Sequence, residues 1–131
     1  MSKRIICFVV GLFGLMCAAH IADTDQLIDE EYKLLAPDGG ATDQFGTSVS
    51  ISGDIAIIGV PNDDDVEKNA GAAYIFSFNG DVWEQEQKLF ASDGASNDDF
   101  GKSVSISSDG STAIVGAHGD DDNGSYSGSA Y

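Results

Sequence analysis

An internal repeat constrains the fold of this sequence more than any other feature. Three blocks recur in register, the first two at an offset of 55 residues and the third, after a two-residue insertion in the second copy, at 57. The blocks are 33–39 with 88–94, 43–52 with 98–107, and 56–74 with 113–131. A period of this length indicates a supersecondary unit that buries its faces against copies of itself.

Within one period, four segments of strand length alternate or run apolar, and Gly, Asp, Asn or Ser bound each of them. The predicted strands are 46–52, 55–60, 72–78 and 82–90. The second is apolar on both faces, which is typical of a strand between packed layers. Asn79-Gly80 indicates a hairpin between the third and fourth. The sequence therefore predicts an all-β fold made of β-propeller blades, each with four antiparallel strands.

The repeated residues resemble the FG-GAP repeat. Phe45-Gly46 and Phe100-Gly101 each precede a serine-rich strand, and a Gly-x-Ala-Tyr strand closes each copy. The pattern is similar to the repeats of the integrin alpha-subunit propeller, and closer to the calcium-loop-poor repeats of many exported microbial proteins. This resemblance covers about residues 30–131. It implies about two blades of a seven-bladed propeller that acts in extracellular binding or adhesion.

Six residues of the repeat are expected to have structural roles. We expect the two phenylalanines to fill the seam between blades, one glycine of each copy to relieve crowding where the strand enters the blade, and a second glycine to allow close approach near the axis. These residues are Phe45, Gly46 and Gly59 in the first copy, and Phe100, Gly101 and Gly116 in the second.

The first nineteen residues have the order of a signal peptide. Lys3 and Arg4 precede a thirteen-residue uncharged run, which is too short for a bilayer span and is followed by Ala18 and Ala19. We therefore predict a secreted or cell-surface protein with no membrane insertion after cleavage. The expected divisions are a signal peptide at 1–19, a lead-in at 20–31, repeat 1 at 32–87 and repeat 2 at 88–131. Repeat 2 is expected to be truncated, because Tyr131 aligns with Tyr74 inside a strand, so we expect a fragment of a larger propeller.

The chain is strongly acidic. It has 22 Asp and Glu against 6 Lys and Arg, a formal net charge of -16, and loss of Lys3 and Arg4 with the signal would leave -18. Nucleic acid is excluded as a partner because its binding depends on basic clusters. An extracellular protein or glycan is the expected partner.

Twelve of the 22 acids fall in the loops before the first strand and between the second and third strands, which a propeller brings to one face. Carboxylate clusters suit Ca²⁺, so this is the one cofactor considered. The candidate ligands are Asp63, Asp64, Asp65, Asp120, Asp121 and Asp122. Solvated turn residues are the alternative. The loops between the first and second strands, where integrin-like repeats bind calcium, read Ser-Gly-Asp and Ser-Ser-Asp-Gly-Ser and lack the ligands.

An enzyme is not expected. His118 has no repeating partner, both cysteines lie inside the signal, and no Gly-x-Ser-x-Gly or His-Glu-x-x-His motif occurs. Asn123 begins an Asn-Gly-Ser sequon and is a candidate for N-glycosylation. Two other functions stay open: a purely structural propeller, and an accessory module of a larger exported enzyme.

Overall fold

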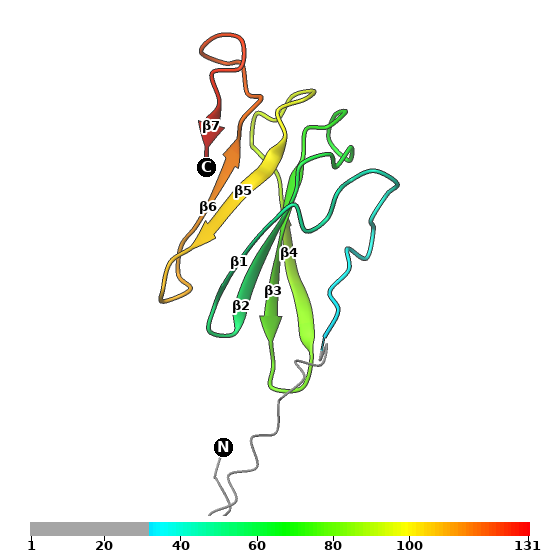
Figure 1. The fold of residues 1–131 in the computed structure, drawn as a ribbon, viewed down its shortest axis with the longest axis vertical. Helices are drawn as coiled ribbons and strands as arrows, with labels where there is room; N and C mark the ends of the chain where they lie inside the picture. Colours follow the sequence, from blue (N-terminus) through cyan, green and yellow to red (C-terminus); the bar gives the residue numbers. More distant parts are fainter. Residues whose placement is uncertain (1–31) are drawn as a thin grey trace, which may run out of the picture. The chain divides into compact units, whose positions relative to one another are not determined.

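The computed structural model describes residues 32–131, so the predicted signal peptide and lead-in lie outside the described residues. The described chain forms two antiparallel sheets in sequence order and contains no helix (Figure 1). The sheets have four and three strands, which confirms the predicted all-β class and agrees with FG-GAP-like blades. No segment of residues 32–131 is a helix of the length and hydropathy needed to cross a membrane.

The first sheet has the strand order β1-β2-β3-β4. Its strands are β1 (Ser48–Ser52), β2 (Ile55–Val60), β3 (Ala72–Phe78) and β4 (Trp83–Leu89). β2 and β3 keep the bounds predicted from the sequence, whereas β1 begins two residues later and β4 is shorter by one residue at each end. Tyr74 lies directly opposite Lys88 in the β3–β4 register.

The second sheet repeats the first as far as the described chain goes. Its strands are β5 (Phe100–Ile106), β6 (Ala113–Ala117) and β7 (Ser129–Ala130), in that order. The pairing of Gly116 with Ala130 reproduces that of Gly59 with Ala73. β7 is therefore the counterpart of β3, and no described strand pairs with its outer edge.

The two sheets pack through a seam that contains the second Phe-Gly pair. Phe100 is 2% exposed and lies in a cluster with residues of both sheets, including Ile57 and Val115. Its amide donates to Ala70 O, and it bridges to Gly71. Gly101 has a φ of +92°, and a Cβ there would overlap the Ala72 carbonyl. The seam thus needs glycine for both backbone angle and space.

Gly46 and Phe45 differ from their counterparts in their surroundings. Gly46 has a φ of +89°, but a Cβ there would meet nothing within 4 Å, so in the described chain it serves backbone angle rather than crowding. Phe45 packs edge-on against Tyr74, with ring centroids 5.6 Å apart. Gly59 lies against Gly101 across the seam. Gly116, its counterpart, lines an open groove beside β6 and β7.

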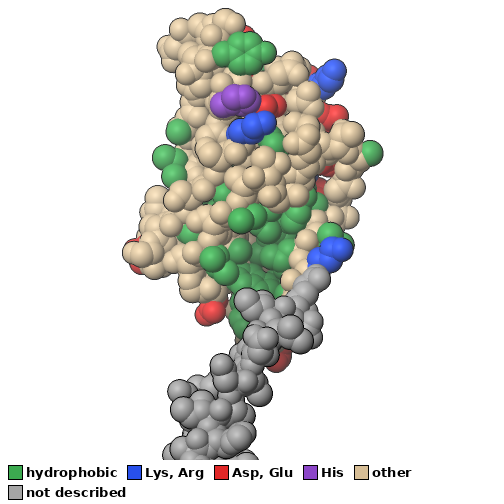
Figure 2. All heavy atoms as spheres, in the orientation of Figure 1, with side chains coloured by type: hydrophobic (Ala, Val, Ile, Leu, Met, Phe, Trp, Pro, Cys, Tyr) green, Lys and Arg blue, Asp and Glu red, His purple; other side chains and the backbone are tan. Residues whose placement is uncertain are grey.

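The serine face of β1, rather than its apolar face, meets the second sheet. Ser48 Oγ donates to Gly101 O at 2.7 Å, and Ser50 Oγ accepts from the Ile106 amide at 3.2 Å. Val49 and Ile51 point away and are about two-thirds exposed. Figure 2 shows hydrophobic side chains over the strands, with the histidine and nearby charged side chains near the top of the view.

Candidate functional site

The loops before β1 and β5 and the loops that follow β2 and β6 gather at one end of the strands (Figure 1). We call this the acidic loop end, and it comprises residues 37–47, 61–71, 91–99 and 118–128. Backbone hydrogen bonds join its loops: Asn62 N donates to Asp43 O, Asn97 N to Lys68 O, and Gly119 N to Asp98 O. The acidic loops therefore form one braced layer across both repeats.

The six predicted metal-ligating residues separate into two kinds within this layer. Asp63 and Asp120 are buried, at 2% and 3% exposure. Asp64, Asp65, Asp121 and Asp122 are exposed. Each buried aspartate accepts a hydrogen bond on Oδ1 from the amide two residues later, at 3.1 Å in the first repeat and 3.0 Å in the second. This turn directs the first carboxylate of each Asp-Asp-Asp run inwards.

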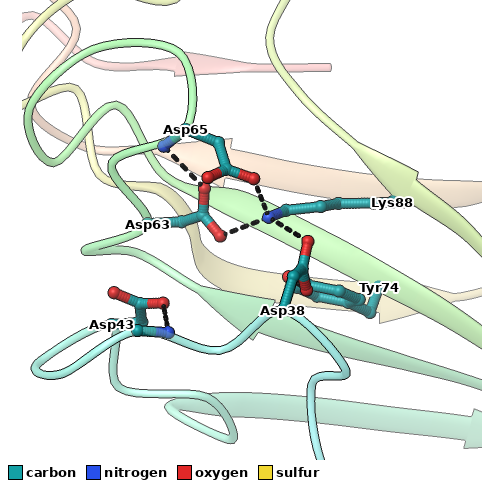
Figure 3. Close-up of polar contacts among 7 residues, drawn as sticks. Asp38, Asp43, Asp63, Asp65, Tyr74 and Lys88 are labelled. Atoms are coloured by element: carbon teal, nitrogen blue, oxygen red, sulfur yellow. Dashed lines mark hydrogen bonds and ion pairs between the residues drawn. The ribbon is translucent and has the colours of Figure 1, made fainter.

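In the first repeat, the Lys88 ammonium lies among three carboxylates (Figure 3). Lys88 Nζ is 2.6 Å from Asp65 Oδ2, 2.7 Å from Asp63 Oδ2 and 3.0 Å from Asp38 Oδ2. It also lies 5.1 Å from the centroid of the Tyr74 ring, and the Tyr74 hydroxyl donates to Asp38 Oδ1 at 2.7 Å. We call this set the lysine centre.

The charges of the lysine centre support one another. Burial opposes the charge of Lys88, but hydrogen bonds to Asp63 and Asp65 outweigh it and raise the Lys88 pKa. The hydroxyl of Tyr74, and then the ammonium of Lys88, lower the pKa of Asp38. Burial and the bond to Asp38 raise the pKa of Tyr74. At neutral pH the ammonium, the Asp38 carboxylate and the neutral phenol therefore coexist.

The same residues occur in a known family. A model of the FG-GAP repeat matches the chain twice, at residues 28–76 and 83–131. The chain belongs to the FG-GAP repeat family. A search of curated proteins found no match. FG-GAP repeats generally form non-catalytic propeller modules, and they are typical of extracellular or surface proteins.

The second FG-GAP repeat reproduces the lysine centre without the lysine. Tyr131 corresponds to Tyr74, and its hydroxyl lies 2.6 Å from Asp93 Oδ1 and 3.0 Å from Asp120 Oδ2. The backbone bond from the Asp122 amide lowers the pKa of Asp120, whereas the charges of Asp120 and Asp93 raise the pKa of Asp122. The repeat thus brings three carboxylates and one phenol together with no described cation among them.

The lysine centre of the first repeat does not fit a calcium ion. Asp38, Asp63 and Asp65 would be its natural ligands, but their Oδ2 atoms converge on Lys88 Nζ. Among residues 32–131, no group of three or more His, Cys, Asp or Glu side chains has the arrangement of a metal site. The first repeat is therefore arranged for an ammonium, and Ca²⁺ binding by Asp64 or by the second repeat stays a prediction.

Other candidate residues of the FG-GAP chain lie at or near the acidic loop end. Asn123 is exposed in the 118–128 loop. His118 Nδ1 is 3.4 Å from Asp99 Oδ2, an ion pair only when the histidine is protonated. Tyr126 is 73% exposed, and with Asp121 and neighbouring polar residues it lines a hollow of about 140 Å³.

Sequence reasoning did not assign roles to Lys88, Tyr74 or Tyr126. A signal for the first two was present, because Lys33 and Lys88 recur at the same offset as the aspartates that follow them, and Tyr74 recurs as Tyr131. Joint recurrence of a lysine, aspartates and a tyrosine indicates a shared polar centre. Tyr126 has no matching aromatic residue in the first repeat, so no repeat signal marks it.

Proposed function

We propose that this chain is an exported FG-GAP β-propeller module that binds an extracellular protein or glycan through its acidic loop end. Membership of the family supports the propeller, and the signal-like order of residues 1–19 supports export. The strongly negative charge is consistent with a ligand that is neutral or basic rather than one rich in phosphate.

One observation carries the proposed binding surface. Tyr126 exposes 73% of its surface at the acidic loop end, next to the hollow that Asp121 lines. Exposed tyrosines are enriched at contact surfaces because a rigid ring with one polar end gives large contact area at low entropic cost. The ring sits on braced loops, so a ligand would meet a preformed surface.

The full chain, tagged at its C-terminus and produced by secretion, should be screened on arrays of extracellular matrix proteins and glycans. Tyr126→Ala should abolish retention of any array ligand. Tyr32→Ala removes another exposed tyrosine, which packs on Phe78 and lies outside the acidic loop end, and it should leave retention unchanged. If both variants lose binding equally, or if no ligand is retained, the proposal is wrong.

Each array is read with Ca²⁺ and with a chelator, because a cation-assisted mode is part of the proposal. Loss of binding in chelator, reproduced by Asp64→Asn or Asp121→Asn, would assign the cation to the exposed carboxylates. Unchanged binding in chelator would mean that the ligand binds at the Tyr126 surface without the help of a cation.

Export is tested separately. The intact mass of the secreted chain should correspond to a mature protein that begins at His20. Retention of the first nineteen residues, or absence of the chain from the medium, would contradict it without affecting the fold.

A further inference from the structure

We propose that Asn123 is an acceptor for an N-linked glycan, which would stand on the acidic loop end of the second repeat. The substrate is an oligosaccharide carried on a lipid pyrophosphate, and a transferase of the host's secretory pathway supplies it. The inference rests on the export that belongs to the proposed function, but it does not depend on the ligand surface at Tyr126.

Asn123 differs from the other asparagines of the chain in what its side chain does. The sequence has five asparagines, and only Asn123 has a serine or threonine two residues later. The other four use their side chains to hold a turn or to join two loops; they are Asn62, Asn69, Asn79 and Asn97. No group within residues 32–131 is hydrogen-bonded to the Asn123 side chain. The usual structural reason for an asparagine in an Asn-Gly turn therefore does not apply, and its amide nitrogen is left available.

The backbone alone presents the Asn-Gly-Ser sequence at the tip of the 118–128 loop. Gly124 N donates to Asp121 O, and Ser127 N donates to Gly124 O, both at 2.9 Å. Asn123, Gly124 and Ser125 are all exposed. Because neither turn uses the Asn123 side chain, a sugar attached to it would break no hydrogen bond of the loop. Glycans are bulky and hydrophilic, so an exposed loop tip of this kind suits them.

The tip of this loop stays exposed when a neighbouring repeat packs beside it. Val66 corresponds to Asn123 in the first repeat, and its loop is bonded to the second repeat through Lys68 O and Asn97 N. Val66 is nevertheless 47% exposed, and Glu67 and Lys68 are exposed as well. A blade on the other side of the second repeat would therefore leave the Asn-Gly-Ser tip accessible.

The proposed step is a glycosyl transfer to nitrogen. Asn123 Nδ2 attacks the anomeric carbon of the first sugar, and a carbon–nitrogen bond forms. The bond from that carbon to the pyrophosphate oxygen breaks, and the lipid pyrophosphate leaves with the electron pair. The amide loses one proton to a base of the transferase, and no oxidant or reductant is needed. A non-proline residue between the asparagine and the serine meets the requirement of the acceptor sequence.

The full chain is expressed in eukaryotic cells behind a heterologous leader, so that entry into the secretory pathway does not depend on residues 1–19. Modification is read in the cells and in the medium, from the change in mass on treatment with a glycan-releasing amidase. We expect the treated chain to lose the mass of one glycan. Release in heavy-oxygen water should convert Asn123 alone into a labelled aspartate, which peptide mass spectrometry locates. The mass that tests export is read after this release.

Two substitutions at the same exposed residue provide the matched control. Ser125→Ala removes the acceptor sequence and should abolish the glycan, whereas Ser125→Thr keeps the sequence and should keep the glycan. The glycosylated wild-type chain and Ser125→Ala should melt within about 4 °C of each other, because the loop is held without the Asn123 side chain.

Three outcomes would overturn the proposal. They are a chain that enters the secretory pathway without modification, a glycan that persists in Ser125→Ala, and a glycosylated chain that melts well below Ser125→Ala. A chain that is modified with the heterologous leader but not with its own would contradict export and leave Asn123 as the acceptor. None of these outcomes bears on Tyr126, so failure here is distinguishable from failure of the proposed ligand surface.

Discussion

Lys88 Nζ lies 2.7 Å from Asp63 Oδ2, and both side chains are largely withdrawn from solvent. Removing one member of such a pair leaves the other as an uncompensated buried charge. We expect Lys88→Met to lower the free energy of unfolding by about 3 kcal/mol, measured by urea denaturation. Lys68→Met, at an exposed lysine, should change it by less than about 0.5 kcal/mol. Equal costs would mean that the lysine centre contributes nothing beyond a surface pair.

The same substitution at corresponding aspartates of the two repeats should have opposite effects on stability: asparagine should destabilise the fold at Asp65 and stabilise it at Asp122. Asp65 is paired with Lys88 but 58% exposed, so Asp65→Asn should cost at most about 1 kcal/mol. Asp122 has a raised pKa because Asp120 and then Asp93 repel its charge, so folding favours its neutral form. Asp122→Asn should therefore raise the melting temperature at neutral pH. Its advantage over the wild-type chain should shrink as the pH falls through that pKa, and a lowered melting temperature at neutral pH would contradict the assignment.

Two of the four tyrosines, Tyr74 and Tyr131, should ionise only at a pH above the usual range for tyrosine. Bonding to Asp93 and burial raise the pKa of Tyr131, and burial and Asp38 raise that of Tyr74. Folding thus stabilises the protonated phenols, and this contribution is complete below the usual pKa near 10 and is lost as the pH rises through the raised values. Titration followed by tyrosinate absorbance should show a late phase. Tyr74→Phe and Tyr131→Phe should each remove part of it, and a single phase near pH 10 would count against both contacts.

Alanine substitutions at Gly46 and Gly101 should separate the cost of backbone strain from the cost of a steric clash, because the two glycines have nearly the same φ but different surroundings. Gly46 and Gly101 have φ values of +89° and +92°, so alanine should cost about 1–2 kcal/mol at either position. A Cβ at Gly101 would also meet the Ala72 carbonyl and the Val60 amide, so Gly101→Ala should cost at least about 1 kcal/mol more. Thermal unfolding of both variants measures the difference. Equal destabilisation would mean that the seam tolerates a side chain there.

The sequence predicts the strands well where the pattern is local. The bounds of β2 and β3 follow from apolar runs closed by turn residues, and the order of the sheets follows from the repeat. β1 begins at Ser48, after the positive-φ Gly46, whereas β5 continues through the positive-φ Gly101 with a shift of register between Phe100 and Ser103. The serine face of β1 is harder to foresee, because its hydroxyls bond to backbone groups of the next sheet.

The candidate site is less predictable than the fold. Asp63, Asp64 and Asp65 are identical in sequence terms, and only the turn after β2 decides that Asp63 is buried and the other two are exposed. Lys88 lies in a Glu- and Gln-rich strand that reads as solvent-facing. Its position beside the carboxylates depends on strand register and on two loops from different parts of the chain, which a local pattern does not encode.

The bonds between neighbouring loops at the acidic loop end have a geometric consequence. Lys68 O accepts from Asn97 N, and the Asn69 side chain donates to that of Asn97, so the 61–71 loop of the first repeat and the 91–99 loop of the second fix each other's position. Carboxylates carried on such loops recur at a spacing set by the stacking of the blades rather than by the flexibility of the loops. The acidic loop end therefore carries one group of carboxylates for each repeat, and the distance between these groups follows the distance between the blades.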